Sequence, residues 1–203
     1  MEPLSAPPAP RIAPGTRAEI GRVNHAIARA LGLVAGGGPP HVFTTLGRHP
    51  VFRRWLRFAG GLMPGGTLRR DETELLILRV GHNCDCAYEL QQHERIALTA
   101  GLSREQIARV AAGPDAPGWT PRQAAFLRAA DALHATRDLD DGVWSALRAE
   151  LTDEQLIELC LVVGHYEMLA MTLNALRVQL DPLPDAGGSR GLRVVQRLVA
   201  RRR

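Results

Sequence analysis

The 203-residue chain has no lysine, few aromatic residues and only three cysteines. Aromatic residues make up 4% of the chain, too few for the aromatic and β-branched surfaces that are typical of β-sheets. Alanine, leucine and arginine are abundant instead, and this composition favours helices, so we expect an all-α fold. Two of the cysteines are one residue apart, which is a poor framework for a disulfide-stabilised secreted domain. The sequence therefore indicates a reducing, cytoplasmic location.

Long apolar runs are also missing from the sequence. No uninterrupted apolar segment approaches the roughly 20 residues that span a bilayer, and the proline-rich N-terminus is unlike an export signal, so we expect no membrane association.

The 25 basic residues, all arginine, and the 21 acidic residues leave a net charge of +4. Only residues 189–203 cluster this positive charge, and we expect their arginines to solvate a surface face instead of binding nucleic acid.

Stretches rich in proline and glycine divide the chain into four segments. Residues 1–15 contain five prolines and are predicted to be a disordered arm. Residues 16–40 are predicted to hold a helix and a Gly/Pro linker. Residues 41–182 are predicted to form the main helical domain, and residues 183–203 an Arg-rich tail or helix.

Helix-start and helix-stop signals place the helices of the main domain. Ser103 and Thr152 open capping boxes, and Gly101 is suited to end a helix. A long apolar helix is expected after Thr152. The predicted helices lie at about 52–58, 69–82, 85–100, 103–113, 120–136 and 152–180.

Four ionisable or nucleophilic side chains are predicted to gather on the central helix pair. At about 100° per residue, Cys86, Glu89 and His93 share the buried face of one helix. Glu74 lies on the apolar face of the preceding helix, and antiparallel pairing would bring it towards the other three. Ionisable groups in a low-dielectric pocket are suited to proton transfer. Cys86, Glu89, His93 and Glu74 are therefore the candidate catalytic residues.

Neighbouring residues are candidates to extend this site. Cys84, Tyr88 and His82 are possible auxiliary residues, whereas Cys160 lies among aliphatic residues and is expected in the core. Residues 84–93 include zinc-ligand types, but the spacing Cys-x-Cys-x2-Glu-x3-His matches no common zinc motif. We therefore expect no metal site.

The stretch from Arg70 to Val110 resembles the core of the carboxymuconolactone decarboxylase and alkylhydroperoxidase D superfamily. The resemblance rests on the tetrad Cys-Ala-Tyr-Glu at 86–89, Glu74 twelve residues before it, His93 after it, and the continuation Ala-Gly-Leu-Ser-x-Glu-Gln-Ile at 100–107. It implies an alkylhydroperoxidase D-like helical fold, a trimeric or hexameric homo-oligomer, a small-molecule substrate and no cofactor.

The same resemblance implies more than one function. In alkylhydroperoxidase D a glutamate, two cysteines and a histidine form a thiol relay; Glu74, Cys86 and His93 match, but Glu89 stands at the place of the second cysteine. The first hypothesis is a peroxiredoxin-type peroxide or disulfide oxidoreductase with Cys86 as nucleophile, and with Cys84 or an external thiol reductant as its partner. The alternatives are a cofactor-free lactone decarboxylase that uses Glu89 and His93, and a non-catalytic ligand-binding module.

Overall fold

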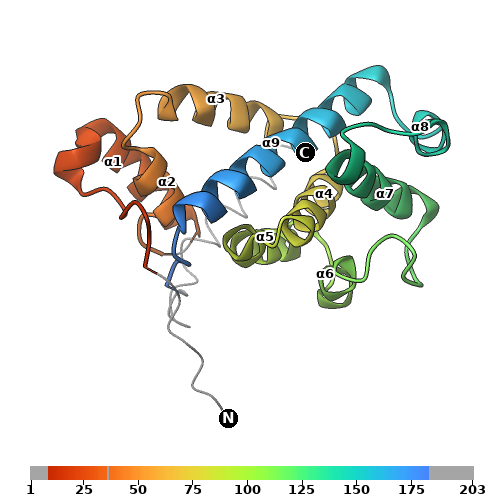
Figure 1. The fold of residues 1–203 in the computed structure, drawn as a ribbon, viewed down its shortest axis with the longest axis horizontal. Coiled ribbons are helices and arrows are strands. Elements are labelled where there is room, and N and C mark those ends of the chain that lie inside the picture. Colours follow the sequence, from red (N-terminus) through yellow and green to blue (C-terminus); the bar gives the residue numbers. More distant parts are fainter. Residues whose placement is uncertain (1–8, 36, 183–203) are drawn as a thin grey trace, which may run out of the picture. The chain divides into compact units, whose positions relative to one another are not determined.

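The computed structural model describes residues 9–182 apart from residue 36. Every regular element in this part of the chain is a helix, which confirms the all-α prediction (Figure 1). The chain divides into two compact units: the larger is Leu56–Thr172, and the smaller combines the residues before and after it. Most of the predicted N-terminal arm and all of the Arg-rich tail at 183–203 lie outside the described residues.

The smaller unit contains helix α1 (Arg17–Ala35) and helix α2 (His41–Leu46). Helix α1 is kinked at Gly21, whose φ of 79° is open to glycine and rarely adopted by other residues. Three aromatic rings, one from α2 and two from the start of helix α3 (Phe52–Leu62), pack together with centroids 6.1 to 6.4 Å apart. These rings belong to Phe43, Phe52 and Trp55.

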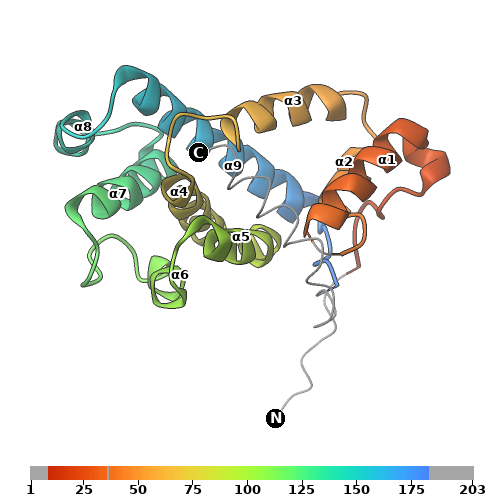
Figure 2. The same ribbon diagram turned by 180° about the vertical axis from the view of Figure 1, so that it is seen from behind.

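The larger unit is built around helix α4 (Arg70–Asn83). The side chains of Leu75–Leu78 are at most 1% exposed, and consecutive buried residues on a helix mean that it is covered on all sides. Helix α5 (Ala87–Ala100) and helix α7 (Pro121–Thr136) pack against α4, and both views show α4 between them (Figures 1 and 2). Helix α6 (Arg104–Val110) adds a further contact with α4.

Helix α8 (Asp141–Arg148) was not among the predicted helices. The Asp140 side chain accepts a hydrogen bond from the Val143 N–H at 2.8 Å and so caps the helix. Leu147 is 1% exposed and anchors this short helix, which packs against α7. A helix of eight residues depends on such packing, because its own hydrogen bonds stabilise it little.

Helix α9 (Asp153–Leu176) is the longest described helix, with 24 residues. By length and composition alone it would be able to cross a membrane, although charged residues interrupt its apolar sequence. However, 56% of its most apolar window is buried within the structure. Such burial is typical of the core helix of a folded domain.

Candidate active site

A three-residue turn at 84–86 joins α4 to α5 and places the predicted nucleophile. The Cys86 N–H donates to the Gly81 carbonyl at 2.9 Å, and the Asp85 N–H donates to the His82 carbonyl at 3.2 Å. These two bonds form a Schellman motif, in which the residue after the helix C-cap takes the left-handed conformation. Asp85 takes that conformation with a φ of 48°, which aspartate tolerates better than most residues. Cys86 thus completes the end of α4 and is also the N-cap of α5.

The Cys86 side chain is fully buried, at 0% exposure. Burial, and then repulsion from Glu89, raise the pKa of its thiol to about 12, even though the backbone N–H groups of Glu89 and Tyr88 act to lower it. The sulfur lies at the N-terminus of α5, which begins at Ala87, two residues later than predicted. In this conformation Cys86 is therefore a protonated thiol beside the positive end of a helix.

Glu74 and His93 form a buried pair between α4 and α5. The Nδ1 atom of His93 is 2.7 Å from Oε2 of Glu74, and the two side chains are 9% and 0% exposed. Arg70, one turn before Glu74, lies 2.8 Å from the other carboxylate oxygen. A buried carboxylate is costly unless it is paired, and here each oxygen has an ion-pair partner. The structure thus brings Glu74 and His93 together, as the antiparallel pairing of their helices requires.

Glu89 lies one turn before His93 on α5 and is 2% exposed. A glutamate at this position of a helix often bonds back to the N-cap N–H, but the Cys86 N–H already donates to Gly81. Neither carboxyl oxygen of Glu89 has a hydrogen-bond partner within the described residues. Burial, and then repulsion from Glu167, raise its pKa to about 8. Glu89 therefore carries a proton at neutral pH.

Helix α9 contributes two rings that were not predicted as site residues. The rings of His93 and Tyr166 meet edge-on with centroids 5.1 Å apart, and Tyr166 meets His165 at the same distance. Burial, and then the Glu74 carboxylate, raise the pKa of Tyr166 well above its usual value. The one sequence signal for these rings is a short repeat. The segments Val-Gly-His and Tyr-Glu, which both occur within residues 80–89, occur again at 163–167.

The remaining predicted residues are found in different surroundings. Tyr88 is buried at 4% exposure. His82 is half-buried, and its pKa is lowered by burial and then by the positive charge of Arg79, which is outside the site. The expectation that Cys160 is a core residue is wrong, because its side chain is exposed on α9. Cys84 belongs to a second cluster.

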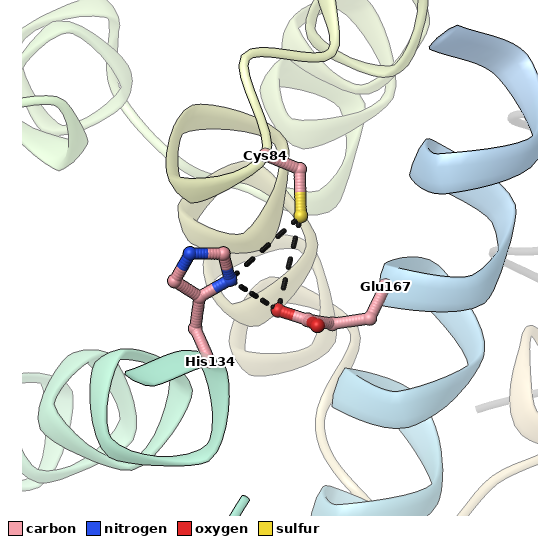
Figure 3. A group of neighbouring side chains, drawn as sticks. All are labelled: Cys84, His134 and Glu167. Atoms are coloured by element: carbon pink, nitrogen blue, oxygen red, sulfur yellow. Dashed lines mark hydrogen bonds and ion pairs between the residues drawn. The ribbon is translucent and has the colours of Figure 1, made fainter. Parts of the chain in front are cut away.

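That second cluster joins three helices of the larger unit (Figure 3). The Cys84 sulfur lies 3.9 Å from Nδ1 of His134 and 3.8 Å from Oε1 of Glu167, and those two atoms are 2.5 Å apart. Arg137 holds the second oxygen of Glu167 at 3.2 Å. Burial, and then Glu167, raise the pKa of the Cys84 thiol to about 12. The three groups are far apart in sequence, so no local motif revealed them.

The sequence and the fold both have known counterparts. Residues 49–132 match the model of the Carboxymuconolactone decarboxylase family. No curated protein matches the chain. A solved structure from Ralstonia eutropha JMP134, described as an alkylhydroperoxidase AhpD core and an uncharacterized peroxidase-related protein, has 22% identity and a TM-score of 0.76, covering 92% of this chain and 98% of its own. The family model confirms the predicted resemblance over residues 49–132, and the structural similarity confirms the predicted fold.

Two further solved structures share this fold at lower identity. An uncharacterized peroxidase-related protein from Silicibacter sp. TM1040 has 14% identity and a TM-score of 0.76, covering 92% of this chain and 100% of its own. The debrominase Bmp8, in a cysteine-to-alanine form in complex with 2,3,4-tribromopyrrole, has 14% identity and a TM-score of 0.71, covering 91% of this chain and 96% of its own. At these identities the similarity shows a common fold.

Proposed function

Since the chain carries a carboxymuconolactone decarboxylase family domain over residues 49–132, we propose that it is a thiol-dependent oxidoreductase that reduces a hydroperoxide with Cys86 as nucleophile. One observation carries this proposal: a thiol at the N-cap of α5 is followed along the same helix by a protonated Glu89 and by the buried His93–Glu74 pair. A nucleophile, a proton donor and a proton acceptor are the groups that peroxide reduction by a thiol needs.

The proposed step converts a thiol and a hydroperoxide into a sulfenic acid and an alcohol. The Cys86 sulfur attacks one peroxide oxygen, so an S–O bond forms, the O–O bond breaks and sulfur is oxidised by two electrons. The thiol proton passes to the Glu74–His93 pair, and Glu89 gives its proton to the departing alkoxide. A proton returning from the pair to Glu89 balances the step. Because Cys86 is fully buried, the packing around the 84–86 turn must open when the peroxide enters.

An external thiol completes the proposed cycle. The sulfenic acid condenses with that thiol to give a mixed disulfide and water, and a second external thiol displaces it to restore Cys86. An internal Cys84–Cys86 disulfide is disfavoured because it would close a tight ring. It would also draw the Cys84 sulfur away from its contacts with His134 and Glu167. We also propose that the protein forms a homo-oligomer.

A cofactor-free decarboxylase is the second candidate. The observation in its favour is that Glu89 is protonated near neutral pH and lies one turn from His93, an acid and base arrangement that requires no sulfur. This candidate differs from the first in its dependence on Cys86. Substituting that cysteine would leave decarboxylation nearly unchanged, whereas His93→Ala would abolish it.

Peroxide turnover with a supplied dithiol tests the first proposal. Cys86→Ser is expected to abolish turnover, and Glu89→Gln to reduce it by about 100-fold or more, because it removes a general acid. Cys160→Ser is the matched control and should keep the rate, since that thiol is exposed and takes no part in the proposed step. Full turnover in Cys86→Ser would refute the proposal. Decarboxylation of a lactone by Cys86→Ala would favour the second candidate instead.

A further inference from the structure

Three side chains with metal-ligating atoms converge in the larger unit, and one of them, Cys84, lies in the same turn as Cys86. From the Cys84, His134 and Glu167 cluster we propose a binding site for one divalent transition-metal ion, of which zinc is the best match. Each residue offers one donor atom, and the three atoms lie within 4.8 Å of one another. Cys84 follows the end of α4, His134 lies near the end of α7, and Glu167 lies in α9 (Figure 3).

The orientation of the histidine argues against a linear proton relay. In a Cys-His-Glu relay the imidazole faces the thiol with one nitrogen and the acid with the other. Here the same Nδ1 atom of His134 is nearest to both Cys84 and Glu167. Donor atoms that point towards one common centre are instead arranged as ligands of a single ion.

The spacing of the donor atoms fits a small tetrahedral ion. Zinc bonds of about 2.3 Å to sulfur and about 2.0 Å to nitrogen or oxygen imply donor separations of about 3.5 Å from the sulfur and about 3.3 Å between nitrogen and oxygen. The observed separations from the Cys84 sulfur are 3.9 and 3.8 Å, close to these values. The His134–Glu167 separation of 2.5 Å is that of a hydrogen bond, so an ion would replace the shared proton and widen the separation.

Arg137 supports the carboxylate from behind. Its Nη1 lies 3.2 Å from Oε2 of Glu167, which leaves Oε1 directed towards Cys84 and His134. The same guanidinium donates to the Leu133 carbonyl at 3.0 Å and to the His134 carbonyl, so it also braces the turn that carries the imidazole. Contacts of this kind commonly orient metal ligands.

The donor set selects the class of ion. One thiolate, one imidazole and one carboxylate suit zinc and cobalt, whereas magnesium and calcium prefer oxygen donors alone. The side chains of His134 and Glu167 are 37% and 18% exposed, so an ion can enter from solvent. Three protein ligands leave the fourth tetrahedral position for water or another small ligand.

Cobalt binding to the chelator-treated full-length protein tests the site. One equivalent of Co²⁺ is expected to produce a thiolate-to-cobalt charge-transfer band and the visible bands of tetrahedral cobalt, and Zn²⁺ should displace them. Cys84→Ser should abolish the charge-transfer band. His134→Ala and Glu167→Gln should each weaken Co²⁺ binding by at least about 10-fold. All three residues are partly exposed, so circular dichroism should show folded variants, and Glu167→Gln decides the result if His134→Ala unfolds.

Two matched cysteine variants make the result specific. Cys160→Ser and Cys86→Ser should both retain the charge-transfer band. A band that persists in Cys84→Ser, or binding that is equally tight in Glu167→Gln, would overturn the metal site. Because the readout needs no peroxide, Cys86→Ser separates this proposal from the proposed function: it should lose turnover and keep the cobalt spectrum.

Discussion

Replacement of Glu89 by glutamine should stabilise the protein in a strongly pH-dependent way. Glutamine has the shape of the protonated carboxyl but never ionises, and Glu89 is 2% exposed with no hydrogen-bond partner for its oxygens in the described part of the chain. In the folded protein its pKa is raised from 4.5 to about 8, chiefly by burial. The folded protein thus holds this proton more tightly than the unfolded chain does.

The sign and size of the effect follow from proton linkage. Between pH 4.5 and about 8 the folded protein keeps the Glu89 proton while the unfolded chain loses it, so the wild type loses stability as the pH rises. At about 1.4 kcal/mol per pH unit, the full shift corresponds to roughly 5 kcal/mol. The advantage of Glu89→Gln in free energy of unfolding should therefore be near zero at pH 4.5 and reach a plateau of a few kcal/mol above about pH 8.

Urea denaturation at a series of pH values between 4.5 and 9 measures this difference, because groups common to both proteins cancel. Glu94→Gln is the matched control: Glu94 is exposed on the same helix, and its substitution should change stability by no more than about 0.5 kcal/mol at any pH. A Glu89→Gln advantage that does not change with pH would refute the conclusion that Glu89 is a buried, protonated acid.

Two further predictions concern the turn and the cysteines. A disulfide-exchange reagent should modify the exposed Cys160 at least about 10-fold faster than the buried Cys86 in the native protein, and equal rates would contradict the burial of Cys86. Asp85→Gly should raise the free energy of unfolding by about 0.5–1 kcal/mol, because glycine adopts the left-handed conformation without strain. Asp85→Val should lower it, and identical urea midpoints for these two variants would exclude this account of the turn.

The helical periodicity predicted much of the candidate site. Because a helix places residues three, four and seven apart on one face, Cys86, Glu89 and His93 were expected together. Glu74 was expected opposite them, and its contact with His93 at 2.7 Å is consistent with antiparallel helices. The roles of these residues in catalysis stay predictions until the variants are measured.

Other features depend on contacts that no local pattern encodes. The Cys84, His134 and Glu167 cluster joins three helices that are distant in sequence, so only the packed fold brings the donors together. Cys160 lies among aliphatic residues and was assigned to the core, but the side of α9 on which it lies is not covered in the folded chain. Apolar neighbours in sequence do not determine which face of a helix is buried.

Oxidation of the three cysteines by one equivalent of hydroperoxide tests the central claim most directly. The native protein would be trapped with a sulfenic acid reagent and its peptides identified by mass spectrometry, with Cys160→Ser as a matched sample that removes the exposed thiol. We predict sulfenic acid on Cys86, lost again when an external thiol is added. Oxidation confined to Cys160, or no oxidation of Cys86 while peroxide is consumed, would contradict the account.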